Sequence, residues 1–158
     1  MYKDQRIVAL IPARGGSKRL PRKNVLPLRG IPLIQWSISS AKGSELIDEV
    51  IVSTDDAEIA TIATRAGAEI LDRPSNLARD HTPSLPVFQD ALQRMRPKAD
   101  LLVVLQPTSP FRRISDIDGA IRTVIDQSAD ALIAVTKAKM GPEWLLQVVD
   151  GFLQMPES

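Results

Sequence analysis

A loop rich in glycine and cations, residues 12–24, carries the side chains of this chain that are best suited to chemistry. It follows an apolar run, residues 7–11, that has the composition of a buried strand. Two adjacent glycines, Gly15 and Gly16, allow backbone N–H groups to converge on an anion, because glycine has no Cβ. The loop contains five cations that can supply compensating charge: Arg14, Lys18, Arg19, Arg22 and Lys23. This combination predicts a site for a triphosphate.

The loop differs from the two common glycine motifs that bind phosphate. It lacks the spaced second glycine followed by Lys and Ser or Thr of a P-loop, and it lacks the pattern Gly-x-Gly-x-x-Gly. For residues 15–18 alone, a Gly-Gly turn with a solvated basic face is an equally good interpretation. The added residues 20–24, Leu-Pro-Arg-Lys-Asn, favour the binding loop.

Positive charge is concentrated near the start of the chain. Residues 5–44 contain eight Lys or Arg and no Asp or Glu, whereas residues 45–158 contain 11 Lys or Arg and 18 Asp or Glu. The net charge of the whole chain is only +1. This uneven distribution indicates a local anion site. A nucleic-acid surface would be more extensive and interleaved with aromatic residues, which make up only 4% of this chain.

Composition is that of one globular domain, which we place at residues 1–158. The chain is 44% hydrophobic and 25% charged, and it is long enough to bury a core. It has no cysteine, which excludes disulfides, thiolate metal sites and thiolate nucleophiles. No apolar run approaches the roughly 20 residues of a membrane span, and the N-terminus lacks the apolar region of a signal peptide. We therefore expect a cytoplasmic protein with no membrane partner.

Strands that alternate with amphipathic helices predict an α/β fold with a mostly parallel sheet. Strands are expected at residues 7–13, 49–54, 68–71, 100–106 and 131–136. Helices are expected at residues 32–42, 57–66 and 85–95, and a further one is expected to start at Ser115, with Asp118 completing a capping-box variant. A β-hairpin is expected around Asp150-Gly151. Ligands bind at the carboxyl ends of parallel strands, which points to the loops at residues 12–30, 53–56, 72–84 and 106–113.

Residues 11–24, Ile-Pro-Ala-Arg-Gly-Gly-Ser-Lys-Arg-Leu-Pro-Arg-Lys-Asn, resemble the signature of the acylneuraminate cytidylyltransferases, the CMP-sialic acid synthetases. Three further blocks resemble the same family in the same order: residues 52–55, Arg73-Pro74 with residues 80–84, and residues 105–110. The Kdo cytidylyltransferases carry a related loop, usually with an aromatic near the Gly-Gly position and Gly-Lys-Pro where this chain has Arg-Lys-Asn. The resemblance therefore favours the neuraminate-like branch.

The resemblance implies a three-layer, Rossmann-like nucleotidyltransferase fold and a reaction between CTP and a 2-keto sugar acid. The anomeric hydroxyl of the sugar would attack the α-phosphorus of CTP, giving the CMP-sugar and pyrophosphate. Lys23 and Arg14 would be the catalytic residues, since they would stabilise phosphate charge, and Gln106 would bind the sugar acid. The nucleotide would be held by Arg14, Gly15, Gly16, Ser17, Lys18, Lys23, Asn24, Arg73, Thr82 and Ser84.

The resemblance also implies a Mg²⁺ cofactor, whose ligands are expected in a C-terminal part that the family has and this chain lacks. We therefore assign no metal ligand here, regard the domain as incomplete at its C-terminus, and expect a homodimer in a full-length form. Asp55 and Asp56 could ligate Mg²⁺, but capping of the helix at residues 57–66 is the interpretation we favour. Asp116 and Asp118 are likewise interpreted as capping residues.

Three alternatives to the neuraminate enzyme stay open at this point. The chain could be a non-catalytic fragment that binds CTP, because the family's metal-binding part cannot be matched. It could also be a cytidylyltransferase for a different sugar acid, such as legionaminic, pseudaminic or Kdo acid, or a sugar nucleotidyltransferase that uses another base. His81, the single histidine, is expected at the surface, and Arg112-Arg113 is expected to be a solvated approach to a helix.

Overall fold

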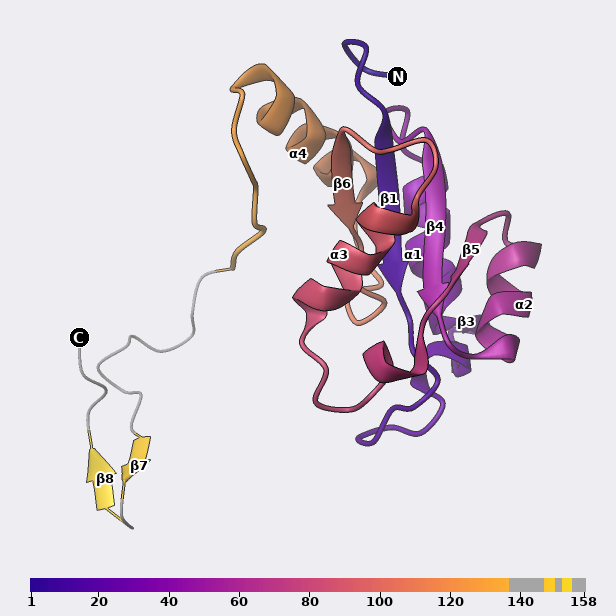
Figure 1. Cartoon of the computed structure of the whole chain (residues 1–158), viewed down its shortest axis with the longest axis vertical. Coiled ribbons are helices and arrows are strands. Elements are labelled where there is room, and N and C mark those ends of the chain that lie inside the picture. The colour runs from indigo at the N-terminus through magenta and orange to yellow at the C-terminus, as the bar shows by residue number, and fades with distance from the viewer. Residues whose placement is uncertain (137–146, 150–151, 155–158) are drawn as a thin grey trace.

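The computed structural model describes residues 1–136, 147–149 and 152–154. A parallel sheet with the strand order β5-β4-β1-β6 forms its centre, built from β1 (Ile7–Pro12), β4 (Glu49–Thr54), β5 (Glu69–Asp72) and β6 (Leu101–Val104). One face packs against α1 (Leu33–Lys42), α2 (Ala57–Arg65) and α4 (Ile114–Asp126). The other face packs against α3 (Ser84–Arg94), as Figure 1 shows. The predicted three-layer α/β fold with a mostly parallel sheet is confirmed.

The side chains of β1 alternate between two apolar clusters. Ile7, Ala9 and Ile11 pack with α1, α2 and α4, whereas Val8 and Leu10 pack with residues of α3. All five are fully buried, as expected for a central parallel strand that is covered by helices on both faces. This strand therefore fixes where the loop that follows it begins.

Short elements complete the described residues. The glycine loop ends in the short 3-10 turn η1 (Lys23–Val25). It is followed by a small antiparallel hairpin whose strands, β2 (Pro27–Leu28) and β3 (Ile31–Pro32), have two residues each. A second short turn, η2 (Ser75–Leu77), follows β5. The predicted C-terminal hairpin is confirmed by the antiparallel pairing of β7 (Gln147–Val149) with β8 (Phe152–Gln154). Its expected turn, Asp150-Gly151, lies outside the described residues.

The strand predicted at residues 131–136 is wrong. These residues have no regular secondary structure, and the side chains of Ile133 and Val135 are 82% and 90% exposed. Their apolar, β-branched composition favours a strand, but a strand also needs a hydrogen-bonded neighbour. Among the residues that the structure describes, β6 pairs only with β1, and residues 131–136 pair with neither.

The capping box predicted at Ser115 and Asp118 is also wrong. The N-cap position of α4 is held by Arg113, so Ser115 lies within the helix. Asp118 is buried and accepts a hydrogen bond from Ser44 Oγ, which itself accepts two backbone N–H groups of the turn after α1. Asp118 therefore links α4 to that turn.

The start of α2 is fixed by Asp56. Its carboxylate accepts the backbone N–H of Ile59 at 3.0 Å, as a side-chain N-cap does. The predicted capping role of Asp56 is thus confirmed. The Arg22 guanidinium also donates hydrogen bonds to this carboxylate, and these bonds lower the pKa of Asp56 against the opposing effect of burial. The helix ends before Gly67, whose φ of +80° suits glycine.

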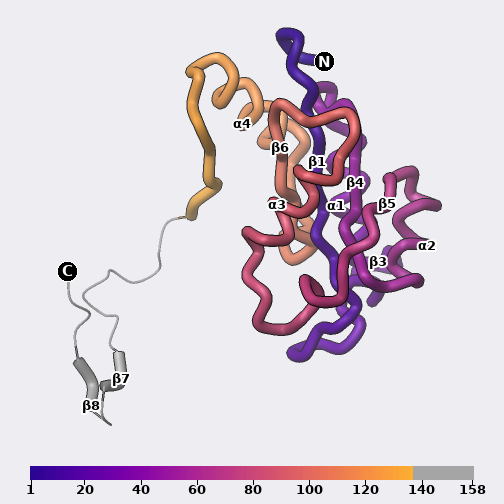
Figure 2. Tube along the Cα trace, viewed as in Figure 1, coloured from indigo at the N-terminus to yellow at the C-terminus, as the bar shows by residue number. Residues whose placement is uncertain are grey.

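The carboxyl ends of β1, β4 and β6 point away from the end of the molecule that holds the N-terminus (Figure 1). The loop after β1 and the segment after β5 lie together at this far end, as the trace in Figure 2 also shows. No helix in the described part of the chain is both long and apolar enough to cross a membrane.

We predict that Ile38→Ala lowers the free energy of unfolding by about 2–5 kcal/mol, because it removes a side chain that is 1% exposed and leaves a cavity. Urea denaturation followed by circular dichroism measures this loss. The matched control is Ile133→Ala, at a side chain that is 82% exposed, which should change stability by less than about 0.5 kcal/mol. Equal losses in the two variants would contradict the assigned core.

We predict that Asp56 makes the free energy of unfolding depend on pH in the acid range. Its folded-state pKa is lowered, so its stabilising contribution is present above its unfolded pKa, about 3.9, and is lost as the pH falls through the folded value. Urea denaturation between pH 5 and pH 2 should therefore show a smaller decrease in stability for Asp56→Asn than for the wild-type chain. The same pH dependence in both would show that Asp56 carries no such contribution.

Candidate functional site

A pocket of about 240 Å³ opens at the carboxyl ends of the parallel strands. The segments that follow β1, β5 and β6 form its walls together with the first turns of α3. This is the edge where ligands bind in parallel α/β sheets. The lining residues are Pro12, Arg14, Ser17, Lys23, Asn24, Arg73, Leu77, Arg79, Asp80, Thr82, Ser84, Val87, Phe88, Gln106, Pro107 and Thr108.

The lining of this pocket is strongly cationic. It contains four cations, Arg14, Lys23, Arg73 and Arg79, and Asp80 is the one carboxylate among the lining residues that the structure describes. Such an excess of positive charge in a concave site attracts a polyanion. The other wall is apolar and includes Val87 and Phe88 of α3, so the pocket can receive a charged group beside a flat, less polar one.

Arg73 is the buried cation of the site, and the residue is only 8% exposed. Its guanidinium donates to Ser53 Oγ at 3.1 Å and to the Ser53 carbonyl at 2.7 Å, so the end of β4 holds it in place. Burial lowers the pKa of Arg73, although an arginine stays protonated in proteins. No carboxylate of the described residues forms an ion pair with it. A buried positive charge without such a partner favours an anionic or polar ligand.

Arg14 and Lys18 both pair with the carboxylate of Asp80. Arg14 Nη1 lies 3.0 Å from Asp80 Oδ1, and Lys18 Nζ lies 2.8 Å from Asp80 Oδ2. The Lys18 ammonium, with Arg14, lowers the pKa of Asp80. These groups are solvent-accessible, so the ion pairs contribute little to stability and can exchange for another anion.

Lys23 and Asn24 enter the pocket from η1. Asn24 is buried, and its Nδ2 donates to the Arg14 carbonyl at 3.0 Å, which ties the two ends of the loop together. Lys23 lines the cavity, and no carboxylate in the described ranges pairs with its ammonium. The structure therefore leaves Lys23 available to an incoming anion.

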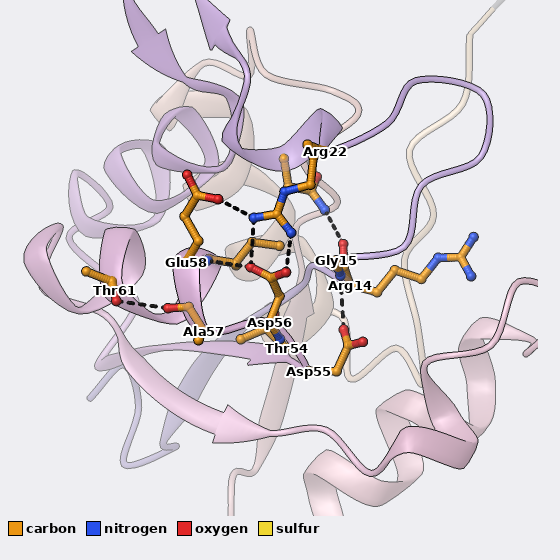
Figure 3. A network of polar contacts seen from close by, with 11 residues as sticks. Arg14, Gly15, Arg22, Thr54, Asp55, Asp56, Ala57, Glu58 and Thr61 are labelled. Atoms are coloured by element: carbon orange, nitrogen blue, oxygen red, sulfur yellow. Dashed lines mark hydrogen bonds and ion pairs between the residues drawn. The ribbon is translucent and has the colours of Figure 1, made fainter.

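Gly15 and Gly16 differ in their surroundings. The Gly15 N–H donates to Asp55 Oδ1 at 3.0 Å, so this donor is already engaged (Figure 3). A Cβ on Gly15 would lie 2.5 Å from Asp56 Oδ2, which explains why a residue without a side chain stands there. A Cβ on Gly16 would meet nothing within 4 Å. Gly16 therefore faces open space beside the loop.

The pair Asp55 and Asp56 does not fit a Mg²⁺ site in this structure. Asp55 accepts the Gly15 N–H, and both oxygens of Asp56 accept hydrogen bonds from Arg22. A guanidinium bound to a carboxylate competes with a cation for the same oxygens. Within the described ranges, no group of three or more His, Cys, Asp or Glu side chains is placed to hold a metal ion.

Gln106 follows β6 and lines the pocket. Its backbone carbonyl accepts a hydrogen bond from Arg112 Nη2 at 2.5 Å, and Arg112 Nη1 donates to Ser37 Oγ of α1 at 3.2 Å. The prediction that Arg112 is a solvated residue is wrong, because it is half-buried and fixes the loop after β6. Arg113 is exposed, as expected, and pairs with Asp116.

The pocket brings together most of the residues predicted to bind a nucleotide and a sugar. Arg14, Ser17, Lys23, Asn24, Arg73, Thr82, Ser84 and Gln106 all line it. Gly15, Gly16 and Lys18 lie in the same loop but are not among the lining residues. The individual roles of these residues stay predictions. His81 is exposed, as expected.

Sequence reasoning missed Arg79 and the apolar wall formed by Leu77, Val87 and Phe88. Arg79 belongs to none of the motifs identified in the sequence. The one signal for it is its position between Arg73 and Thr82, which were predicted to bind the nucleotide. Phe88 of α3 packs against the apolar cluster on that face of the sheet, and Val87 is buried. Its second contact, with the pocket, depends on where α3 crosses the sheet.

A family model described as Cytidylyltransferase matches residues 8–145. A CMP-N,N'-diacetyllegionaminic acid synthase from Legionella pneumophila is 38% identical over 157 residues, covering 96% of this chain and 67% of that protein. An N-acylneuraminate cytidylyltransferase from Escherichia coli O18:K1:H7 is 35% identical over 148 residues, covering 93% of this chain and 35% of that protein.

A solved structure described as CMP:2-keto-3-deoxy-manno-octonic acid synthetase complexed with CTP has the same fold. It superposes with a TM-score of 0.69 at 28% identity, covering 78% of this chain and 49% of that one. The chain thus spans about two thirds or less of the length of these relatives. The match to most of the chain, together with the pocket at the end of the parallel sheet, shows that the chain belongs to the cytidylyltransferase family.

Proposed function

We propose that this protein transfers the CMP group of CTP to a 2-keto sugar acid of the N-acylneuraminate kind and releases pyrophosphate. The observation that carries the proposal is the convergence of Arg14, Lys23 and Arg73 in one pocket of a cytidylyltransferase-family chain. A relative of similar fold is described as complexed with CTP, which supports the choice of nucleotide.

In this proposal the triphosphate lies along the glycine loop. Lys23 and Arg14 face its phosphates, and the hydroxyl of Ser17 donates a further hydrogen bond. The triphosphate displaces Asp80 from Arg14, because a polyanion interacts with these cations more strongly than one carboxylate does. The base and ribose lie toward Arg73, Thr82 and Ser84, beside the apolar wall of α3.

The chemical step needs positioning and charge stabilisation more than a covalent intermediate. The anomeric oxygen of the sugar acid forms a bond to the α-phosphorus while the bond from that phosphorus to the oxygen bridging the β-phosphate breaks. Pyrophosphate leaves with the electron pair of that bond, and the hydroxyl proton passes to solvent water. Lys23 stabilises the charge that develops around the α-phosphate, and Gln106 orients the acceptor.

The relatives do not select one sugar acid, since their names refer to legionaminic, N-acylneuraminic and 2-keto-3-deoxy-manno-octonic acids. The shared chemistry is a 2-keto acid with an anomeric hydroxyl, and we propose this class as the acceptor. A Mg²⁺ requirement, with protein ligands outside the described residues, stays a prediction. A homodimer and a cytoplasmic location also stay predictions.

Calorimetric titration of the chain with CTP, ATP, GTP and UTP tests the nucleotide, and we expect CTP to bind most tightly. Pyrophosphate release with CTP, Mg²⁺ and N-acetylneuraminic, legionaminic, pseudaminic and Kdo acids then tests the transfer. Turnover with at least one acid supports the proposal. CTP binding without turnover supports the non-catalytic alternative, and failure to bind CTP would overturn both.

We predict that Lys23→Ala lowers kcat/KM, because a preorganised cation is lost from the α-phosphate. The loss corresponds to about 2–4 kcal/mol of transition-state stabilisation, and we expect a similar loss for Arg14→Ala. Steady-state pyrophosphate release measures both. The matched control is Arg19→Ala, which removes an exposed cation of the same loop that does not line the pocket. Its rate should stay within about twofold of wild type. A near wild-type rate for Lys23→Ala would refute its assigned role.

A further inference from the structure

Three acidic residues at the start of α2 bind the glycine loop at both of its ends (Figure 3). At the first end, Asp55 Oδ1 accepts the backbone N–H of Gly15 at 3.0 Å. At the other end, the Arg22 guanidinium bridges Asp56 and Glu58, with hydrogen bonds to both oxygens of Asp56. We call the contact between Arg22 and Asp56 the loop clamp.

The loop clamp holds Arg22 in a backbone conformation that is unfavourable by itself. Arg22 adopts a φ of +57°, a left-handed conformation that costs a non-glycine residue about 1–2 kcal/mol. The fork of Arg22 on Asp56 offsets this cost with charge-assisted hydrogen bonds. Gly15 lies so close to Asp56 that a Cβ there would clash with the carboxylate. The loop is thus fitted closely to this acid.

The residue after Arg22 is Lys23, which lines the pocket. Arg22 is the N-cap residue of η1, the short turn that carries Lys23 and the buried Asn24. Arg22 itself is not among the described residues that line the pocket, and its charge is engaged by two acids. Lys23 therefore lines the pocket directly after a residue that lies outside the lining and is held by the start of α2.

We propose that Asp56 is a positioning residue for the reaction, acting through Arg22 to aim Lys23 into the pocket. This inference rests on the proposed function, because the ligand it serves is the triphosphate of CTP. The proposal has a counter-intuitive consequence. A carboxylate near a polyanion site opposes binding by simple Coulomb repulsion, yet this carboxylate strengthens binding by holding the loop.

The variant Asp56→Asn separates the two effects. The remaining Oδ1 can still cap Ile59, since asparagine is as good an N-cap as aspartate, but the new NH₂ group faces the Arg22 guanidinium and breaks the fork. We expect the Kd for CTP to rise about tenfold, the kind of loss that follows when a binding group is misplaced. An unchanged or lower Kd would overturn the proposal.

The matched control is Glu58→Gln, which removes an equal charge from the same guanidinium. The Glu58 side chain is largely exposed, and in the described structure its hydrogen bond is with Arg22. Its Kd for CTP should stay within about twofold of wild type. A tenfold rise here as well would show that loss of charge on Arg22, and not the fork on Asp56, controls binding, and would overturn the role of Asp56.

A double-mutant cycle with Arg22→Ala tests whether Arg22 instead binds the triphosphate directly. If Arg22 and Asp56 act as one clamp, the double variant binds CTP about as weakly as either single variant. If Arg22 is a direct ligand, Asp56→Asn releases it toward the phosphates and tightens binding, whereas Arg22→Ala weakens it. The second pattern would overturn the clamp.

Hydrogen exchange without ligand tests the clamp independently of the proposed function. Backbone amides of residues 16–23 should exchange faster in Asp56→Asn than in wild type, while those of α2 keep their protection because the cap remains. Unchanged exchange in the loop would overturn the clamp even if CTP binds. If the wild-type chain fails to bind CTP, the proposed function falls and faster loop exchange would still support the clamp.

Discussion

Repulsion between the cations gathered at one edge of the sheet is the constraint that shapes this site. The cations Arg14, Lys18, Arg19, Arg22 and Lys23 lie within one stretch of ten residues, and like charges in water repel by about 1 kcal/mol when they are about 4 Å apart. The loop stays folded because acids from other segments offset most of this charge. Asp80 pairs with two of the cations, and Asp56 with Glu58 takes a third.

Because the cations are paired in different ways, they can take different roles. Arg22 is held by two acids at the start of α2, so it acts as part of the scaffold. Arg14 is held by Asp80 at an accessible position, so its partner can be exchanged for a ligand. Arg73 is fixed by a carbonyl and a hydroxyl of Ser53, which hold its position without neutralising its charge. The strongest fixed attraction for an anion is therefore deep in the pocket.

Much of the fold could be predicted because it depends on local patterns. The predicted strands at residues 7–13 and 49–54 correspond to β1 and β4, because each contains a run of apolar residues of the kind found in buried parallel strands. The rule that ligands bind at the carboxyl ends of such strands was enough to bring Arg14, Arg73 and Gln106 to one edge. No knowledge of side-chain contacts was needed for this step.

The remaining features depend on partners far away in the sequence. The contacts of Arg22 with Asp56 and of Ser44 with Asp118 follow from how loops and helices lie on the sheet, and local spacing carries no signal for them. Residues 131–136 show the reverse case, in which a strong strand pattern lacks a neighbouring strand in the described structure. Propensity predicts which conformation a segment prefers, whereas pairing decides whether it is formed.

The segments that line the pocket follow strands with different numbers of neighbours in the sheet. The glycine loop continues from β1, which is hydrogen-bonded to a strand on each side, and it is further tied by Asn24 and the loop clamp. Gln106 continues from β6, which pairs with β1 alone in the described structure, and Arg112 is its link to α1. Arg73, proposed for the nucleotide, also follows a strand, β5, that has a single neighbour among the described residues, and it is the Ser53 carbonyl and hydroxyl that fix its side chain. The pocket residues beyond the edge strands therefore depend on side-chain hydrogen bonds to neighbouring segments, whereas those of the glycine loop continue from a strand that is paired on both sides.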